Sequence, residues 1–176
     1  MKIMMLNTIK NVSNTRHAQR GAAAVEFAII AMLLFTVLFG IIEFGRLFYV
    51  INTVQEVTRR AAREAVVRWV DNSNTSPAKV IALFGGASLP AGAEITAANI
   101  DIQYLTASGG VPGTLPGSAA ENISACLTGP TDCIALVQVS IINASYVPMV
   151  RLFPFLRLRI PASTVTMPAE SLGYSG

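Results

Sequence analysis

The sequence "GAAAVEFAIIAMLLFTVLFGII", residues 21–42, decides the fold, because it is an apolar run that holds a single ionisable side chain, Glu26. The roughly 21 residues after Gly21 rise about 31 Å as a helix, which is the thickness of the hydrocarbon core of a bilayer. The run therefore predicts one membrane-spanning helix. A charge costs about 2.5 to 3.5 kcal/mol at the centre of a bilayer and less near a helix end. The position of Glu26 near the start of the run therefore needs a physical reason.

The composition also indicates a membrane protein. Of the 176 residues, 52% are hydrophobic and 13% are charged, about half the charged fraction of a typical soluble domain. The net charge of +3 arises before the run, where four of the thirteen basic residues lie without an acid, so that nine basic residues remain against ten acidic ones. These four are Lys2, Lys10, Arg16 and Arg20. The basic charge belongs to this leader, and we expect no nucleic-acid partner.

The helical pattern continues beyond the apolar run. Apolar residues recur at steps of three and four from Leu47 to Ala65, and opposite charges lie four residues apart from Glu56 to Arg68. This pattern is typical of an amphipathic helix with weak charge pairs on its exposed face. We therefore predict a helix over residues 22–70, membrane-spanning in its first half and amphipathic in its second.

The remainder of the chain predicts a small β domain. Turn formers from Asp71 to Pro77 end the long helix, and Ser76 and Pro77 begin a short helix in a linker over residues 71–94. Alternating apolar residues then predict four strands in an antiparallel domain over residues 95–176. The strand segments are "EITAANIDIQYLT", "IALVQVSII", "FLRLRI" and "STVTM". The predicted fold class is α+β, with the long N-terminal helix followed by this sheet, whose apolar face needs the helix or a neighbour to cover it.

A Gly/Pro-rich segment of residues 108–133 separates the first two predicted strands. We expect it to be a surface loop, because it is too long for an ordinary connection. Cys126 and Cys133 flank its turn-forming part. A disulfide between them is expected outside the cytoplasm, with two free thiols as the alternative. The pair alone does not have the spacing of a zinc site.

The sequence offers little for catalysis. The only histidine, His17, lies in the basic leader, and the acids of the C-terminal part are scattered over loops and strands. A nucleophile with a base and an orienting group therefore cannot be assembled from spacing, nor can a histidine-rich metal site. We expect no catalytic residues, no metal, no cofactor and no enzymatic activity.

The first 70 residues resemble a known family. The segments "RGAAAVEFAII", "GIIEFGRLFY" and "VTRRAAREAVV" resemble the TadE-like pseudopilins of the tight-adherence (Flp, type IVb) pilus system, and the C-terminal half resembles them only in outline. The resemblance implies a pilin-like fold and a leader, residues 1–21, that a prepilin peptidase removes by cutting between Gly21 and Ala22. It also implies that Glu26 and Phe27 belong to the assembly motif, and that Glu26 pairs with the new terminal amine of a neighbouring subunit.

Glu43 is the second acid of this pattern, and two interpretations stay open. It pairs locally with Arg46, three residues on, or it contacts another assembly protein. The resemblance further implies that the partners are prepilin peptidase, other pilins and pseudopilins, an inner-membrane assembly platform and membrane lipid. We place the protein in the bacterial inner membrane as a single-pass protein, with the leader cytoplasmic, the C-terminal domain periplasmic, and a position on the pilus or cell surface after assembly.

The expected function is that of a minor pseudopilin-like structural protein that helps to assemble or cap an adhesion pilus. The major pilins of this system are very short and mostly helical, whereas about 100 residues follow the long helix here, which favours a minor or tip-located subunit. The alternative is an uncleaved single-span protein whose extracytoplasmic domain binds a partner. The mature N-terminus distinguishes the two.

Overall fold

The structure is a computed structural model that describes residues 10–129 and 132–173, with side chains from residue 21 onward. Residues 1–9 of the predicted leader lie outside the described residues. The chain divides into two compact units, Met1–Phe44 and Gly45–Gly176. The second unit is called the domain below.

Helix α1 runs from Lys10 to Val66 and contributes its last residues, from Gly45 onward, to the domain. It ends four residues before the predicted boundary at Val70. Near this end the chain returns, and the backbone N–H of Leu172 donates to the carbonyl oxygen of Val66 at 3.3 Å. The last carbonyls of a helix have no partner within the helix, so this contact helps to satisfy the end of α1.

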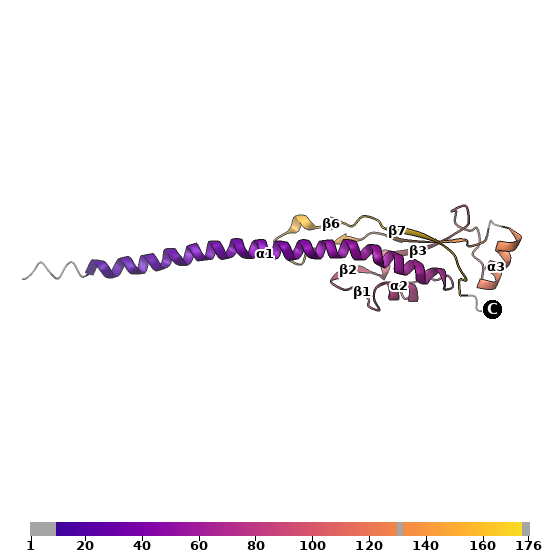
Figure 1. The fold of residues 1–176 in the computed structure, drawn as a ribbon, viewed down its shortest axis with the longest axis horizontal. Helices are drawn as coiled ribbons and strands as arrows, with labels where there is room; N and C mark the ends of the chain where they lie inside the picture. Colours follow the sequence, from indigo (N-terminus) through magenta and orange to yellow (C-terminus); the bar gives the residue numbers. More distant parts are fainter. Residues whose placement is uncertain (1–9, 130–131, 174–176) are drawn as a thin grey trace, which may run out of the picture. The chain divides into compact units, whose positions relative to one another are not determined.

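Three antiparallel strands form the main sheet of the domain, in the order β3 (Ile100–Leu105), β4 (Leu136–Ile141) and β7 (Thr164–Pro168) (Figure 1). Two short pairs complete the strands. They are β1 (Ser88–Leu89) with β2 (Gly92–Thr96), and β5 (Ser145–Tyr146) with β6 (Leu158–Arg159). A 3-10 turn, η1 (Ala97–Asn99), joins β2 to β3. The α+β class with a long N-terminal helix is confirmed.

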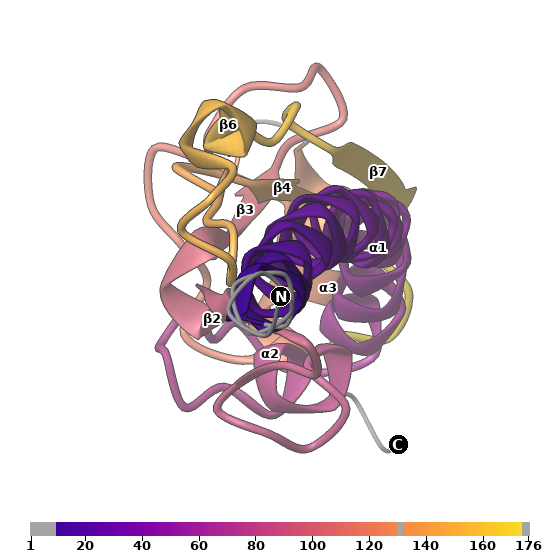
Figure 2. The same ribbon diagram turned by 90° about the vertical axis from the view of Figure 1, so that its left-hand side faces the viewer.

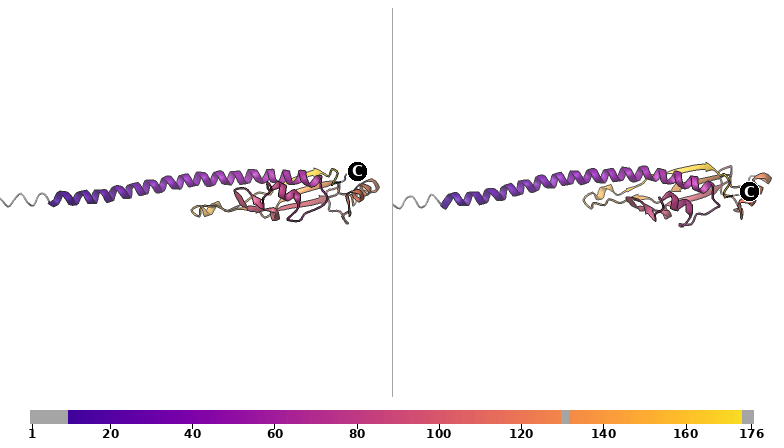
Figure 3. Two further views of the ribbon diagram at one scale, coloured as in Figure 1. Left: turned by 90° about the horizontal axis from the view of Figure 1, so that it is seen from below. Right: turned by 60° about the horizontal axis from the view of Figure 1, so that its bottom comes forward.

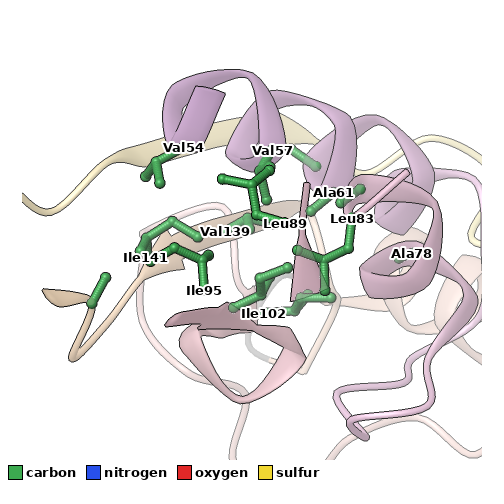
Figure 4. Packing of buried hydrophobic residues seen from close by; sticks show 14 of the residues in the cluster. Val54, Val57, Ala61, Ala78, Leu83, Leu89, Ile95, Ile102, Val139 and Ile141 are labelled. Atoms are coloured by element: carbon green, nitrogen blue, oxygen red, sulfur yellow. The ribbon is translucent and has the colours of Figure 1, made fainter. Parts of the chain in front are cut away.

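The domain part of α1 covers the apolar face of the sheet (Figure 4). The register places Ile102 opposite Val139, so that alternate side chains of both strands point to one face. Figure 2 shows β4 and β7 on one side of α1 and α2 on another. The buried residues of α1, β3 and β4 include Val50, Val54, Val57, Ala61, Ile100, Ile102, Tyr104, Val137, Val139 and Ile141.

Helix α2 (Pro77–Ala82) lies where the short helix was predicted. Pro77 occupies the first turn, as expected, because its missing N–H is not needed there. Ser76 lies at the N-cap position, but its buried side chain makes no capping hydrogen bond. The backbone carbonyl of Ser76 begins the helix instead, by accepting from the N–H groups of Lys79 and Val80 at 3.0 Å each.

The segment predicted as a loop contains a helix, α3 (Ala119–Thr128). Ser118 accepts a hydrogen bond from the N–H of Glu121 at 3.2 Å, and the Glu121 carboxylate accepts from the N–H of Gly117 at 2.8 Å. The sequence signal was present, because a serine followed three residues later by a glutamate is a capping-box pattern. The abundant glycine and proline around it concealed the signal.

The strand predicted over "FLRLRI" is mostly wrong. A 3-10 turn, η2 (Pro154–Leu156), occupies its start, and β6 has only two residues. Leu156 and Ile160 are buried, but Leu158 is 45% exposed, so the alternation does not define one buried face. Pro154 lies in the first turn of η2, and Pro161 has no N–H to extend a ladder.

Candidate functional site

The helix of the first unit exposes apolar side chains around its whole circumference. Among the described residues, one helix is long and apolar enough to cross a membrane, and no part of its most apolar stretch is buried. Phe27, for example, is 73% exposed and Met32 is 70% exposed. The other large apolar side chains exposed in this stretch are Val25, Ile29, Ile30, Leu33, Leu34, Phe35, Val37, Leu38, Phe39, Ile41, Ile42 and Phe44.

So much contiguous apolar surface is unfavourable in water. Burial of one large aliphatic or aromatic side chain is worth about 1.5 to 3 kcal/mol, and soluble monomers rarely expose patches larger than a few hundred square ångströms. Lipid or other apolar helices are therefore the expected surroundings of this helix.

Four of the five predicted cleavage and assembly residues lie together at the start of this apolar stretch, and the fifth, Glu43, follows its end. Gly21, Ala22, Glu26 and Phe27 are all helical and exposed. Ala22 and Glu26 are four residues apart, which places them on the same face of the helix, one turn from each other. Between residues 21 and 42, Glu26 is thus an exposed carboxylate among mostly apolar side chains.

Gly21 has no local structural role in the described chain. A β-carbon built on it meets no atom within 4 Å, and its backbone is not in the left-handed region. Glycine inside a helix costs about 1 kcal/mol relative to alanine. The fold alone therefore gives no reason for a glycine at this position.

Glu43 differs from Glu26, since its side chain is buried, with 1% exposure. A carboxylate at this depth requires partners. The two interpretations of Glu43, a local pair with Arg46 and a contact with an assembly protein, stay predictions.

The comparison with known families matches this same part of the chain. Residues 21–63 match the family model described as TadE-like protein. This segment is TadE-like. The match begins at Gly21 and includes Glu26, Phe27 and Glu43, and it confirms the family resemblance found in the sequence. No curated protein and no solved structure matches the chain.

Arg46 connects the TadE-like segment to residues outside it. Within the domain, its guanidinium donates to both carboxylate oxygens of Glu94 on β2 at 2.9 Å each, and to the carbonyl oxygens of Ala91 at 2.8 Å and Val147 at 2.9 Å. It also lies 4.8 Å above the ring of Tyr146. The spacing of residues does not predict this pair, because Glu94 is one of several scattered acids and lies 48 residues from Arg46.

A second polar cluster fixes the turn that follows α1. The side chain of Asn72 accepts from the backbone N–H of Ile102 and donates to Asp101, both at 3.1 Å. The buried ammonium group of Lys79 donates to the carbonyl oxygen of Asn72 at 2.8 Å. Burial lowers the pKa of Lys79 from its usual 10.5, against the opposing charges of Asp101 and Asp71. Asn72 thereby occupies part of the outer edge of β3.

Tyr104 closes this cluster, because its hydroxyl accepts a hydrogen bond from the N–H of Asp71 at 3.1 Å. Burial raises the pKa of Tyr104 above its usual 10.0, and the bond from Asp71 opposes the shift. A hollow of about 430 Å³ adjoins this hydroxyl and is also lined by Arg68, Trp69 and Asp71. These contacts anchor the turn to the sheet. Among the side chains that the structure describes, from residue 21 onward, no group of three His, Cys, Asp or Glu residues is arranged to hold a metal.

Cys126 and Cys133 are joined by a disulfide, with a Cα–Cα distance of 4.8 Å. The disulfide connects α3 to the segment that leads into β4. Asn122 supports the same connection, because its side chain accepts from the N–H of Ile134 at 2.8 Å and donates to the carbonyl oxygen of Ile134 at 3.2 Å.

Proposed function

We propose that this protein is a minor structural subunit of a tight-adherence pilus system, held in the inner membrane by its apolar helix and processed by a prepilin peptidase. One observation carries the proposal. The TadE-like match begins at Gly21, and from there the helix is exposed and apolar with Glu26 as its single ionisable side chain up to residue 42.

Cleavage after Gly21 would create a positively charged partner for the Glu26 carboxylate. The α-amine of Ala22 becomes the new terminus, and with a reference pKa near 8 it is largely cationic at neutral pH. Glu26 lies four residues further along the helix, about 6 Å deeper, so the amine of a neighbouring subunit reaches it when the two helices pack with an axial offset of about one turn. The pair neutralises both charges, and because their desolvation offsets much of the attraction, its main effect is to fix the register of the helices.

The absence of a local role for Gly21 supports recognition by a peptidase. The described chain accommodates a β-carbon at this position without a clash, so recognition by a peptidase is a reason for glycine here that the fold itself does not supply. The folded domain of residues 45–176 supports the role of a minor subunit. A filament of packed subunit helices would have to hold this domain at its end or accommodate it between the helices.

Replacement of Glu26 tests the proposal. Glu26→Gln keeps the size of the side chain and removes its charge. We expect the variant to be inserted and cleaved as in the wild type, and its incorporation into pili to fall at least about tenfold, the effect of losing roughly 1.4 kcal/mol. Glu26→Asp, which retains the charge, is the control and should assemble better than Glu26→Gln. Wild-type amounts of Glu26→Gln in purified pili would contradict the assembly role.

Replacement of Gly21 tests processing separately. Gly21→Val should leave the domain folded and block removal of the leader. Gly45→Ala is the matched control, because a β-carbon at this helical glycine also meets no atom within 4 Å, and it should be processed normally. Normal cleavage of Gly21→Val would exclude this glycine as a recognition element.

The alternative is an uncleaved single-span protein whose domain binds a partner outside the cytoplasm. It is favoured by the domain having a core of its own. Under this alternative, the wild type and Gly21→Val both keep residues 1–21, and their location is the same.

A further inference from the structure

The connection between β5 and the end of β6, residues 147–159, presents apolar side chains in two directions. We call it the Phe155 loop. Phe153 and Leu156 are buried and pack into the core of the domain. Phe155 is 66% exposed and Leu152 is 56% exposed. The other exposed apolar side chains of the loop are Val147, Met149 and Leu158. The ring of Phe155 packs edge-to-face on that of Phe153, with ring centroids 6.0 Å apart, but most of the Phe155 side chain remains exposed.

The charge of the Phe155 loop has one sign. Arg151, Arg157 and Arg159 are exposed, and the sequence contains no acid between Asp132 and Glu170. Among the described residues, none of the three arginines forms an ion pair. Exposed apolar side chains interspersed with unneutralised arginines are typical of protein segments that lie in the interface of an anionic bilayer.

Contacts within the domain place this loop beside Arg46. The guanidinium of Arg46 donates to the carbonyl oxygen of Val147 at 2.9 Å and lies over the ring of Tyr146. Only three residues separate Arg46 from Ile42, the end of the apolar run. At about 1.5 Å per helical residue, Arg46 lies within roughly 6 Å of the end of that run. Figures 1 and 3 show β6 at the opposite end of the domain from α3.

We propose that the Phe155 loop is a second membrane contact, in which Phe155 and its exposed apolar neighbours enter the bilayer interface and the three arginines bind the phosphates of anionic phospholipids. Lipid is favoured over a protein partner, because chain connectivity holds the loop close to the end of the apolar helix and its charge complements anionic headgroups. The proposal requires that this helix spans a membrane, and it is independent of leader cleavage and of any role in a pilus.

Tryptophan fluorescence tests the contact. The chain has one tryptophan, so Phe155→Trp in a Trp69→Phe background reports the loop alone. The full-length protein is reconstituted into vesicles of equal parts phosphatidylcholine and phosphatidylglycerol, with brominated or ordinary acyl chains. Bromine quenches indole only at close range, and we expect quenching to about half or less of the unbrominated signal if the side chain enters the interface.

Leu127→Trp in the same background is the matched control, because Leu127 is an exposed apolar residue, 83% accessible, on α3 at the other end of the domain. Its fluorescence should not change with bromination. Replacing Arg151 and Arg157 by glutamate should reduce the quenching at position 155 in anionic vesicles. If Trp69→Phe does not fold, Trp69 is retained. The quenching by brominated lipid is then compared between Phe155→Trp and the wild-type protein.

Two results would overturn the proposal. One is equal fluorescence at position 155 in brominated and ordinary lipid. The other is a blue shift at position 155 that depends on protein concentration without quenching by bromine, which would assign the loop to a protein interface.

Discussion

The guanidinium of Arg46 on α1 is bonded to the Glu94 carboxylate on β2 through both carboxylate oxygens at 2.9 Å. Their side chains are only 13% and 11% exposed. This pair joins the first turn of the domain part of α1 to β2. Arg46 therefore fixes the first turn of the domain helix against β2 and against the start of the Phe155 loop.

Glu94→Gln should destabilise the domain by about 1.5 to 3 kcal/mol, because it removes the negative charge from a carboxylate that accepts two hydrogen bonds from a largely buried guanidinium. Glu64→Gln is the matched control, since Glu64 forms an i,i+4 pair with Arg68 whose side chains are 29% and 46% exposed. Loss of that pair should cost less than about 0.5 kcal/mol. Urea unfolding of the full chain in detergent micelles measures both. Equal effects would show that the Arg46 pair contributes no more than a surface pair.

The stability of the domain should depend on pH in the alkaline range, with opposite contributions from two residues. Burial lowers the pKa of Lys79 below 10.5, so the unfolded state holds more protons between the folded value and 10.5, and stability rises with pH there. Burial raises the pKa of Tyr104 above 10.0, so the folded state keeps its proton longer, and stability falls as pH increases above 10.0.

Two variants separate these contributions. Lys79→Met should abolish the rise below pH 10.5, and Tyr104→Phe should reduce the fall above pH 10.0. The measurement is the unfolding free energy of each full-length variant as a function of pH. An unchanged slope in Lys79→Met would contradict the assignment to its ammonium group.

Reduction of the disulfide should loosen α3 and leave the main sheet intact. Cys126 and Cys133 are seven residues apart, and closing so short a loop stabilises by about 2 kcal/mol in the chain-entropy account. The hydrogen bonds of Asn122 remain and limit the loss. Hydrogen exchange of Cys126→Ser/Cys133→Ser should therefore accelerate in α3 and not in β4. Acceleration of the same size in β4 would show that the bridge stabilises the whole domain.

Local patterns in the sequence predicted the elements that repeat regularly. The alternation of Ile100, Ile102 and Tyr104 corresponds to β3, and that of Val137, Val139 and Ile141 corresponds to β4. These patterns succeed because one face of each strand is buried under α1, so that burial and strand geometry have the same period. The apolar run of residues 22–42 predicted a membrane-spanning helix for a different reason. Apolar side chains at nearly every position give a helix an apolar surface on all sides, as a helix surrounded by lipid requires.

Such local patterns do not predict long-range contacts or short turns. The partnership of Arg46 with Glu94 and the insertion of Asn72 at the edge of β3 depend on how the chain folds back, which no spacing encodes. In the Phe155 loop, Pro154 replaces a strand by a turn and brings Leu158 to the surface. The sequence also could not separate the exposed Glu26 from the buried Glu43, because burial of Glu43 is a property of the folded chain.

The most direct measurement is the N-terminal sequence and intact mass of the protein extracted from membranes of cells that contain a prepilin peptidase. The account predicts a polypeptide that begins at Ala22, with a free amine one turn before Glu26. A polypeptide that still carries residues 1–21 in those cells would contradict it.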